Sequence, residues 1–408
     1  MTQTNASQPG LSLNLMEHME EPFQFYQFLQ EQETIVFSPD VQAWLIPRYE
    51  DVRSILAQPD IFSSHDFTRP LPLTPDALGV LAQGCPIMPV AIDSDGMEHR
   101  RRREPHLKGF SVAGVKAREQ PIRETANRLI DSFIQDGHAE ILSQFVYPFS
   151  LETVLNLLGI PHDHMQEVKG WVINMVNLLF GNVRTNEEQV ASAQGFVAFQ
   201  KFMAELIEER RANPQNGELD ALIGYQVPGQ EPLSSLELLS VAMGFLAAGH
   251  RSTLDVCTNA FALLLKDRSR WENLCAHPEQ IPSTAEEILR YEGSVQTLFR
   301  VTTQEVEIRG TKLPAGSRVV LLIGSANRDE AQFPGADVFD HHRTPNRHLA
   351  FGHGVHFCVG APLGRLEIRI VLETFTQRLP TLRLVPDQKL VHNPTILFRG
   401  YDKMLLEW

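Results

Sequence analysis

The sequence predicts a mainly α-helical protein with small β-sheets. Apolar residues recur every three or four positions over most of the chain from residue 100 onward, which is the pattern of amphipathic helices. Alternation of apolar and polar residues is confined to short segments bounded by Pro, Gly and Asp, which indicates short strands. A composition of 43% hydrophobic and 21% charged residues is typical of a folded globular protein.

The longest expected helix runs from Ser234 to Leu265. Ser234 is followed by Glu237 at the spacing of a capping box, in which each side chain bonds the backbone N–H of the other residue. The same 3.6-residue period predicts further helices, and these are Pro121 to Phe133, Leu151 to Leu158, Met165 to Phe180, Gln189 to Arg211, Thr284 to Tyr291 and Ala361 to Arg378.

Short strands are expected in two places. Ile35 to Pro47 predicts a hairpin near the N-terminus. Val301 to Ile308 and Arg318 to Ile323 flank a turn at Pro314 to Gly316 and predict a second pair. Ala331 to Ala350 lacks a period and is rich in Pro, Asp, His, Asn and Arg, so we expect a long irregular loop, a kind of segment that is usually functional.

The charge balance argues against general binding of nucleic acids or anionic membranes. The chain has 36 Lys plus Arg and 50 Asp plus Glu, so its net charge is 36 − 50 = −14. No stretch reaches the ~18 consecutive apolar residues of a membrane span. The four cysteines are scattered and no secretory signal precedes them, so we expect a cytoplasmic protein without disulfides.

The segment from Phe351 to Gly360 is the most informative for chemistry. Gly352, Gly354 and Gly360 surround Cys358 just before an expected helix, and glycines allow close backbone approach to a flat group. A thiolate near a helix N-terminus is stabilised by the helix dipole and by backbone N–H groups, which suits a cysteine ligand to iron. The alternative is a buried structural cysteine, the common fate of a lone cysteine in a cytosolic protein.

This segment resembles the haem-binding signature of the cytochrome P450 family, Phe-x-x-Gly-x-x-x-Cys-x-Gly, which Phe351, Gly354, Cys358 and Gly360 meet in full. Ala326 to Asp329 and Phe333-Pro334 are also similar to family positions. The resemblance implies the cytochrome P450 fold, haem b as cofactor and Cys358 as the metal ligand. It further implies a structural ion-pair triad made of Glu287, Arg290 and Arg343.

The resemblance also implies a single domain over residues 1–408. Within it we expect a flexible tail at residues 1–13 and a helical lobe at about 100–291 and 361–378. We expect β-rich parts at about 35–60, 295–325 and 380–408.

Haem propionates need cations in an acidic protein, and several residues are candidates. His99 and Arg103 are similar to a family His-x-x-x-Arg, Arg300 follows the helix with Arg290, and His356 precedes Cys358. Solvated or structural roles are the alternative for each of them. The run Arg100 to Arg103 also suggests a basic patch for an acidic electron carrier. The expected cofactor-binding residues are His99, Arg103, Ala248, Gly249, Arg300, Phe351, Gly352, His356, Cys358 and Gly360.

Ala247 to Thr253 resembles the oxygen-binding segment of the family, which usually reads Ala-Gly-x-Asp/Glu-Thr. In this chain Arg251 takes the place of the acid and Ser252 that of the alcohol, and Thr253 follows. The acid and the alcohol help to deliver protons, so this departure bears on oxygen activation. We expect Ser252 to be the functional alcohol, since Thr253 points about 100° further round the helix.

Arg251 has three possible roles. It pairs with a nearby carboxylate, or its planar guanidinium binds a substrate carboxylate. In the third case it relates to peroxide-driven family members, which carry an arginine near this position. We therefore take Arg251, Ser252 and Thr253 as the candidate catalytic residues.

Substrate contacts are expected from apolar segments placed by the resemblance. They include the loop Phe62 to Val90 and the helix Trp171 to Phe180, and each is as often core as pocket. Gln296 and Thr297 are the expected polar anchors for a small or medium hydrophobic substrate. The candidate substrate residues are Met243, Ala247, Val295, Gln296, Thr297, Leu298, Phe299, Ile396 and Leu397.

The resemblance implies a monomeric monooxygenase that inserts one atom of dioxygen into such a substrate. The chain lacks Gly-x-Gly-x-x-Gly and CxxC motifs, so we expect electrons from a ferredoxin and a ferredoxin reductase. One alternative is a peroxide-using enzyme whose carboxylate-bearing substrate binds Arg251. The other is a haem-binding sensor without catalysis.

Overall fold

The computed structural model describes residues 12–65, 67, 73–86, 88–107, 109–180, 185–215, 217–226, 229, 231–393 and 395–408. The chain divides into two compact units. Unit 1 comprises residues 1–65, 255–358 and 375–408, and unit 2 comprises residues 66–254 and 359–374. Most of the expected N-terminal tail, and part of the loop expected at residues 62–90, lie outside the described residues.

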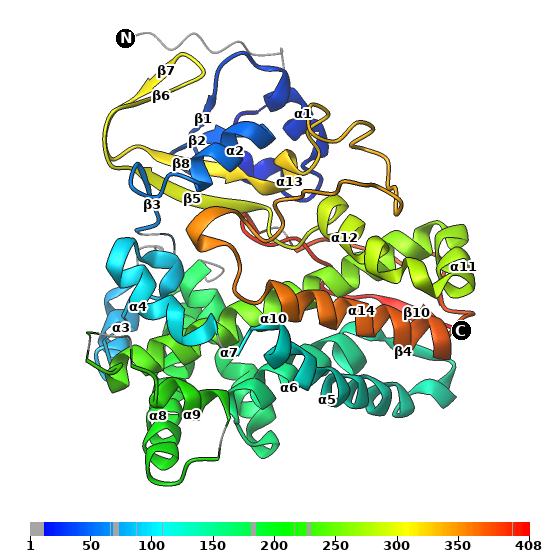
Figure 1. The fold of residues 1–408 in the computed structure, drawn as a ribbon, viewed down its shortest axis with the longest axis horizontal. Coiled ribbons are helices and arrows are strands. Elements are labelled where there is room, and N and C mark those ends of the chain that lie inside the picture. The colour runs from blue at the N-terminus through cyan, green and yellow to red at the C-terminus, as the bar shows by residue number, and fades with distance from the viewer. Residues whose placement is uncertain are drawn as a thin grey trace. The chain divides into compact units, whose positions relative to one another are not determined.

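Unit 1 is built on a five-stranded sheet in the order β1-β2-β8-β5-β3 (Figure 1). The strand β2 runs parallel to β8, with Leu45 opposite Val320, and the other neighbouring strands are antiparallel. The strand bounds are β1 Val36–Ser38, β2 Ala43–Ile46, β3 Phe62–Ser63, β5 Thr297–Thr302 and β8 Arg318–Leu322. The hairpin expected at Ile35 to Pro47 is confirmed.

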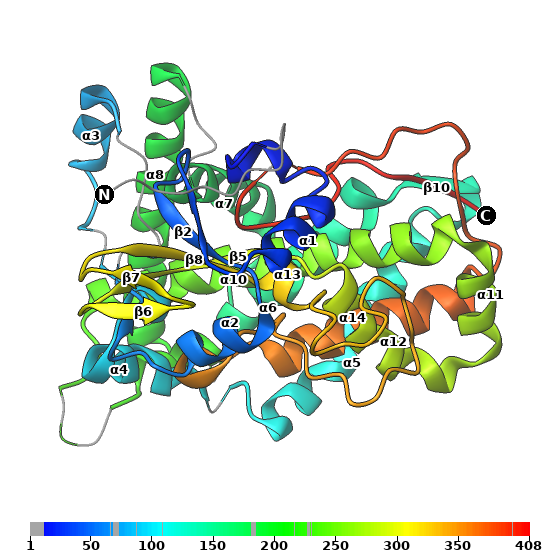
Figure 2. The ribbon, with the colours of Figure 1, turned by 90° about the horizontal axis from the view of Figure 1, so that it is seen from above.

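Alternation along β8 directs its side chains to two apolar clusters, one with each of two helices. Figure 2 shows these two helices, α1 and α2, beside the sheet. Val319 and Leu321 join the cluster that contains helix α2, Tyr49–Leu56. Val320 and Leu322 join the cluster that contains helix α1, Phe23–Glu31. The central strand of the sheet is therefore buried on both faces, which explains its unbroken apolar sequence.

The rest of unit 1 consists of short elements and irregular chain. The segment Val301 to Ile308 is not one strand, because its first residues end β5 and its last three form β6, which pairs with β7. Ala331 to Ala350 has no regular secondary structure, as expected. The further elements are 3-10 turns at Leu15–His18, Pro278–Gln280 and Gly354–His356, helices α11 Arg268–Ala276, α12 Ile281–Tyr291 and α13 Ile323–Ala326, and strands β6 Val306–Ile308, β7 Thr311–Leu313, β9 Arg383–Leu384 and β10 Leu405–Glu407.

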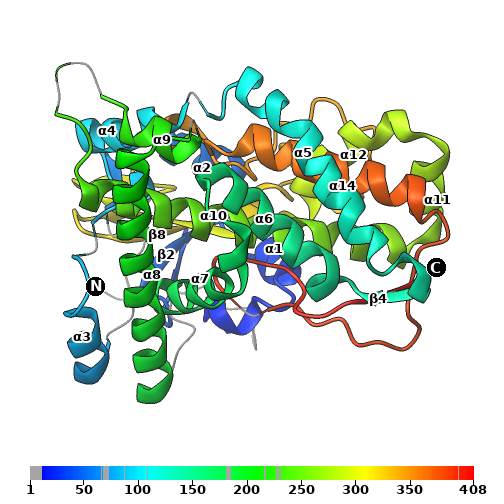
Figure 3. The same ribbon diagram turned by 90° about the horizontal axis from the view of Figure 1, so that it is seen from below.

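Unit 2 is almost entirely helical. Helices α6, α7, α8 and α9 pack together around a large apolar core, to which the first part of α10 contributes Leu239 and Leu246 (Figure 3). The bounds are α3 Pro75–Leu81, α4 Gly96–Leu107, α5 Val112–Asp131, α6 Tyr147–Leu158, α7 Met165–Phe180, α8 Asn186–Ala212, α9 Glu218–Ile223, α10 Ser235–Lys266 and α14 Ala361–Arg378. Short 3-10 or π turns lie at Ala91–Asp93, Ile134–Asp136, Leu142–Val146 and His162–His164, and strand β4 is His138–Glu140. The chain positions of α10 after Leu254 and of α14 after Thr374 belong to unit 1.

The helix predictions are confirmed for the long periodic segments, and two of them, α7 and α14, have the expected bounds. The helix expected from Pro121 begins earlier, at Val112, because Ser111 caps it and Pro121 is accommodated inside. The helix α10 is as long as expected, and in the part of the chain that the structure describes no helix is both long and apolar enough to cross a membrane.

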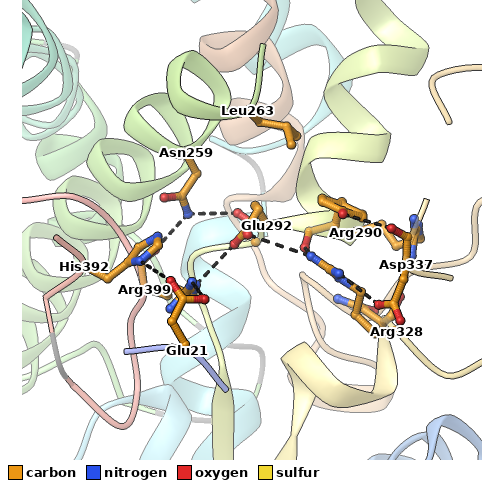
Figure 4. A network of polar contacts seen from close by, with 12 residues as sticks. Glu21, Asn259, Leu263, Arg290, Glu292, Arg328, Asp337, His392 and Arg399 are labelled. Carbon is orange, nitrogen blue, oxygen red and sulfur yellow. Dashed lines mark hydrogen bonds and ion pairs between the residues drawn. The ribbon is translucent and has the colours of Figure 1, made fainter. Parts of the chain in front are cut away.

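Segments distant in sequence meet around Glu292 in unit 1 (Figure 4). The Glu292 carboxylate accepts a hydrogen bond from Arg399 Nε at 3.2 Å and faces Arg328 at 3.8 Å. Asn259 Nδ2 donates to the carbonyl oxygens of Glu292 and Arg399, both at 2.9 Å. Arg328 also donates to Asp337 at 3.0 Å. This network fastens the C-terminal segment and the irregular loop to the chain that follows α12.

The first prediction concerns the start of α10. Ser234 and Glu237 form the expected capping box: Glu237 N donates to Ser234 Oγ at 3.3 Å, and Ser234 N donates to Glu237 Oε2 at 2.9 Å. Ser234→Ala should lower the free energy of unfolding by about 1 kcal/mol, because the backbone donor of the first turn loses its acceptor. Denaturant titration measures this loss. Ser235→Ala is the matched control, and an equal loss there would contradict the capping role.

Candidate active site

The loop before α14 has a backbone that only glycine adopts readily at two positions. Gly352 and Gly354 have φ angles of 71° and 72°. A Cβ atom at Gly354 would also collide with the carbonyl oxygen of Leu56. The loop closes on itself, since Cys358 N donates to Phe351 O at 2.8 Å and Phe357 N donates to Gly354 O at 3.0 Å. These contacts fix where the Cys358 side chain leaves the backbone.

Apolar side chains and a thiol are exposed together on this loop. Cys358 is exposed, as are Phe357 and Val355, although cysteine and phenylalanine are among the residues most often buried. The Phe351 and Phe357 rings lie 6.3 Å apart, centre to centre. An exposed thiol among apolar side chains, on a loop with two left-handed glycines, fits a flat apolar group bound through sulfur. It does not fit the alternative of a buried structural cysteine.

The candidate cations lie on both units. In unit 1, Arg300 is buried and donates to Phe299 O at 2.6 Å, and the His356 ring is 3.0 Å from Ser64 Oγ. In unit 2, α4 carries a buried His99 and a partly buried Arg103. The neighbouring arginines of the basic run are paired with carboxylates, in the pairs Arg100–Glu104, Arg101–Glu237 and Arg102–Glu98. This pairing weakens the interpretation of the run as an open docking patch.

Glu287, Arg290 and Arg343 lie together in unit 1. Arg290 donates twice to the Glu287 carboxylate, at 2.8 and 2.7 Å, and both side chains are fully buried. Arg343 Nε donates to the same carboxylate at 3.3 Å. Arg290 also donates to the carbonyl oxygens of Asn327 and Ala336, so the pair ties α12 to the irregular loop that precedes Phe351. The hydrogen bonds from Arg290 to these carbonyl oxygens help to compensate its buried charge.

The segment Ala247 to Thr253 forms two turns of α10 within unit 2. Ala248 is exposed, whereas Gly249 is partly buried and a Cβ atom there would lie 2.9 Å from Val154 on α6. Ser252 Oγ donates to Ala248 O at 2.8 Å, and Thr253 Oγ1 lies 3.2 Å from Gly249 O. Both hydroxyls thus bond one turn back along the helix, as Ser and Thr often do in helix interiors.

Arg251 acts on the aromatic and imidazole groups beside it. The pKa of His250 is lowered to about 3, mainly by burial and in addition by the positive charges of Arg251 and Lys169. Burial raises the pKa of Tyr147, and the same Arg251 charge opposes that rise. His250 Nδ1 is 2.7 Å from Ser150 Oγ on α6. The Arg251 guanidinium therefore lies near the place where α10 packs on α6, and its charge affects the pKa values of residues on both helices.

Glu367 on α14 is a buried carboxyl group beside Thr253 that sequence reasoning did not single out. Its Oε2 atom lies 2.9 Å from Thr253 Oγ1, and burial raises the pKa of its carboxyl to about 8. A signal was present in the sequence, because Glu367 interrupts the apolar stripe made by Leu363, Leu366 and Ile370. A carboxyl group on the buried face of a helix requires a hydrogen-bond partner, and in this structure Thr253 is that partner.

The candidate substrate residues fall into two groups. In unit 1, Gln296 N donates to Leu397 O at 2.8 Å and Val295 bridges to Phe398, so residues 295–299 and 396–397 lie side by side. In unit 2, Met243 is buried in the apolar core and Ala247 packs against that core.

The two expected polar anchors are engaged within the protein. Gln296 donates to Gly293 O at 2.7 Å and accepts from Tyr26 at 3.2 Å, whereas Thr297 donates to Ile396 O at 2.8 Å. Both side chains are buried. This geometry favours a structural role for both residues, because their strongest polar contacts hold unit 1 together.

Comparisons with known proteins identify the family. The cytochrome P450 family model matches residues 281–397. The chain is 34% identical to the mycinamicin IV hydroxylase/epoxidase of Micromonospora griseorubida over 374 residues. This alignment covers 90% of each chain. The chain belongs to the cytochrome P450 family. A steroid C26-monooxygenase of Mycobacterium tuberculosis strain H37Rv is 32% identical, over 87% of this chain and 86% of its own.

Solved structures of P450 proteins share the fold. The haem domain of a P450 from Acinetobacter radioresistens superposes with a TM-score of 0.91 at 30% identity, covering 97% of both chains. An intact type IV self-sufficient P450 monooxygenase gives a TM-score of 0.92 at 31% identity, covering 98% of this chain. The present chain spans 52% of that longer protein. The predicted P450 fold is therefore confirmed.

Family membership establishes the coarse function. This P450 is an oxidoreductase of the monooxygenase class, as the names of its relatives indicate, and the family implies haem as its cofactor. Those names favour catalysis over the alternative of a haem-binding sensor. Exposure of Cys358 on its glycine loop agrees with a protein that takes up haem.

The second prediction concerns the buried ion pair of α12. Glu287→Ala should lower the free energy of unfolding by about 3–5 kcal/mol, because Arg290 would keep a buried charge without its counter-ion. Thermal or denaturant unfolding of the holoprotein measures the change. Glu272→Ala, which removes the exposed partner of Arg268, is the control and should have little effect. A small loss at Glu287 would show that the pair is not needed to hold the loop.

Proposed function

We propose that this P450 is a haem-thiolate monooxygenase in which the Cys358 sulfur binds the iron of haem b. The observation that carries the proposal is the exposed Cys358 thiol on a loop that two left-handed glycines and the Phe351 hydrogen bond hold in shape. A thiolate ligand donates electron density to iron and favours O–O cleavage. Cys358 stands just before α14, whose N-terminal N–H groups favour an anionic sulfur.

Different residues of the chain would bind different parts of haem b. Phe351, Gly352 and Gly360 accompany Cys358 on the loop, and Leu298 lies within 4.0 Å of a Cβ atom placed at Gly352. The propionates are strong anions that require cationic or hydrogen-bonding partners. For this task we propose His99, Arg103, Arg300 and His356, and on the family resemblance we assign Ala248 and Gly249 to the oxygen side.

The reaction needs an electron source, dioxygen and protons. Bound haem supplies the activation of dioxygen and the oxidation of the substrate. The chain's own part is to hold the sulfur ligand, to exclude water with apolar side chains and to offer hydroxyl groups. Ser252 and Thr253 are the candidate hydroxyls, and Ala248 leaves space beside them because its side chain is a single methyl group.

For the substrate we propose a small or medium hydrophobic organic molecule. The half-buried Val295, Leu298, Phe299 and Ile396 of unit 1 and the Ala247 methyl of unit 2 are apolar candidates for contacts. Relatives named for mycinamicin IV and for a steroid support an organic substrate of this class. Gln296 and Thr297 are not proposed as anchors, because their polar atoms bond within unit 1.

For the electron source we propose a ferredoxin with its ferredoxin reductase, and the cytoplasm as the compartment. The chain matches 52% of a longer self-sufficient P450. Electrons would therefore come from redox groups that are not part of these 408 residues. Only part of the basic run on α4 is available for docking, since Arg100, Arg101 and Arg102 already pair with carboxylates.

The third prediction tests the sulfur ligand. Cys358→Ala should abolish the long-wavelength Soret band of the reduced, carbon-monoxide-treated protein, because that band requires a thiolate on the iron. Difference absorption spectroscopy of reconstituted protein gives the result. Cys85→Ser is the matched control and should leave the band unchanged. A band that persists in Cys358→Ala would overturn the assignment.

A second candidate function follows from Arg251, which stands where the family usually has an acid. In it the enzyme uses hydrogen peroxide and a carboxylate-bearing substrate that binds the guanidinium. In the structure the Arg251 charge influences the pKa values of His250 and Tyr147, which lie beside it in unit 2.

The fourth prediction separates these two functions. If Arg251 holds the substrate, Arg251→Ala should weaken fatty-acid binding about tenfold or more, because a charge-assisted pair is lost. Titrations that follow the Soret band with a fatty acid and with its methyl ester measure the effect. Under the main proposal, Arg251→Ala changes neither affinity by more than about twofold. A selective loss for the acid, together with peroxide-driven turnover, would establish the second function.

A further inference from the structure

His348 lies in the irregular segment that leads into the Cys358 loop, and both nitrogens of its ring have partners. The His348 side chain is only 2% exposed. Its Nε2 atom lies 3.1 Å from Glu286 Oε2 on α12, and its Nδ1 atom accepts a hydrogen bond from Ala350 N at 3.2 Å. All of these residues belong to unit 1, as Cys358 does.

The two contacts determine which nitrogen of the imidazole carries the proton. A backbone N–H can only donate, so the Nδ1 atom that faces Ala350 is the unprotonated nitrogen. The proton of the ring is then on Nε2, where it points to the Glu286 carboxylate. Each of the two partners therefore supports the tautomer that the other requires.

The backbone of Ala350 sets the direction in which the Cys358 loop begins. Ala350 immediately precedes Phe351, whose carbonyl accepts from Cys358 N at 2.8 Å. Because a peptide group is planar, a bond to the Ala350 N–H fixes the plane through which the chain enters this residue. Only the backbone dihedral angles of Ala350 and Phe351 separate that plane from the Phe351 carbonyl. His348 is therefore placed to influence the hydrogen bond that closes the loop.

The peptide group between Leu349 and Ala350 is bonded at both of its ends. Its carbonyl, Leu349 O, accepts from Gly352 N at 2.8 Å, and its N–H donates to His348 Nδ1. Among the residues that the structure describes, His348 is the acceptor found for this N–H. A backbone N–H that loses its acceptor in a partly buried position destabilises the arrangement that it was part of.

Helix α12 holds this segment through two adjacent carboxylates. Glu287, which is fully buried with Arg290, accepts from Asn346 Nδ2 at 3.0 Å. Glu286 holds His348, two residues further along the chain. The first tie belongs to the ion-pair triad, whereas the second lies outside it and leads directly to the start of the Cys358 loop.

We propose that His348 is a positioning residue for the proposed thiolate ligand. Its ring accepts the Ala350 N–H, Glu286 holds the ring in the required tautomer, and together they fix the start of the Cys358 loop. This inference rests on the proposed haem-thiolate function. The imidazole acts here as a hydrogen-bond acceptor for the backbone, and the contact with Glu286 serves to orient it.

Two variants of His348 separate its two contacts. His348→Asn places a side-chain oxygen where Nδ1 stands, and asparagine readily accepts from the N–H two residues ahead, but this side chain is too short to reach Glu286. His348→Gln places an amide nitrogen near the position of Nε2 and keeps the contact with Glu286, but it has no acceptor at the position of Nδ1. His348→Ala removes both contacts, and Glu286→Gln removes only the negative charge.

The matched controls are His277→Ala and Glu279→Gln. His277 and Glu279 form another His–Glu pair of unit 1, in which Nδ1 lies 3.3 Å from Oε1. Both side chains are more than half exposed, so this pair contributes little to the structure. The two control replacements change the same residue types and should leave every measurement as it is in the wild type.

Two measurements are made on the holoprotein. Amide hydrogen exchange, read by mass spectrometry at single-residue resolution, reports on the Ala350 N–H whatever the ligand of the iron is. The Fe–S stretching band in the resonance Raman spectrum reports how uniformly the sulfur ligand is held. The first measurement tests the contact, and the second tests its effect on the ligand.

We expect exchange at Ala350 to be about tenfold or more faster in His348→Ala and in His348→Gln, because the hydrogen bond is lost. The Fe–S band should broaden in the same two variants. His348→Asn should restore both the slow exchange and the narrow band. Glu286→Gln should speed exchange by only about threefold, because a neutral amide oxygen still accepts from Nε2. A general loss of stability would not be repaired by asparagine and left unrepaired by glutamine.

Three results would overturn the inference while leaving the proposed function intact. They are an unchanged exchange rate at Ala350 in His348→Ala, an unchanged Fe–S band in that variant, and restoration by glutamine instead of asparagine. A wild-type holoprotein that has no Fe–S band would instead refute the proposed function itself.

Discussion

The position of the Cys358 sulfur depends on the backbone of the loop that precedes it. Gly352 and Gly354 take left-handed angles, and the Phe351 carbonyl accepts from Cys358 N, so the loop has little freedom to move the thiol. The same loop is held from behind within unit 1, because Gly354 lies against the carbonyl of Leu56 and His356 contacts Ser64. A metal ligand is effective only when its surroundings fix it, and for the proposed ligand Cys358 the backbone of the loop would do this.

Buried charge supports that loop at a distance. Arg290 and Glu287 lie in a fully buried pair, and Arg290 reaches the carbonyls of Asn327 and Ala336. The irregular segment after α13 has no secondary structure of its own, so these side-chain bonds replace the missing backbone ladder. The network around Glu292 does the same for the C-terminal segment through Arg399 and Asn259. Such networks of side-chain bonds specify one arrangement of a chain that periodicity cannot order.

Sequence reasoning succeeded where a local pattern determines the structure. The apolar period predicted α7 and α14 with their bounds, and the Ser234 and Glu237 spacing predicted a real cap. It succeeded less where the outcome depends on contacts between distant segments. In the sequence Gln296 looks like an open polar anchor, whereas in the structure Tyr26 and Gly293 bond it. The contact between Thr253 and Glu367 likewise joins residues more than 100 positions apart. Glu367 itself was visible only as a charge on an apolar stripe, and its partner comes from another helix.

The central claim is that sulfur from Cys358 is bonded to haem iron, and X-ray absorption fine structure at the iron edge tests it most directly. The account predicts one sulfur scatterer in the first coordination shell of iron in the holoprotein, and its replacement by a light atom in Cys358→Ser. A first shell made only of nitrogen and oxygen in the unsubstituted protein, or a sulfur that survives in Cys358→Ser, would contradict it.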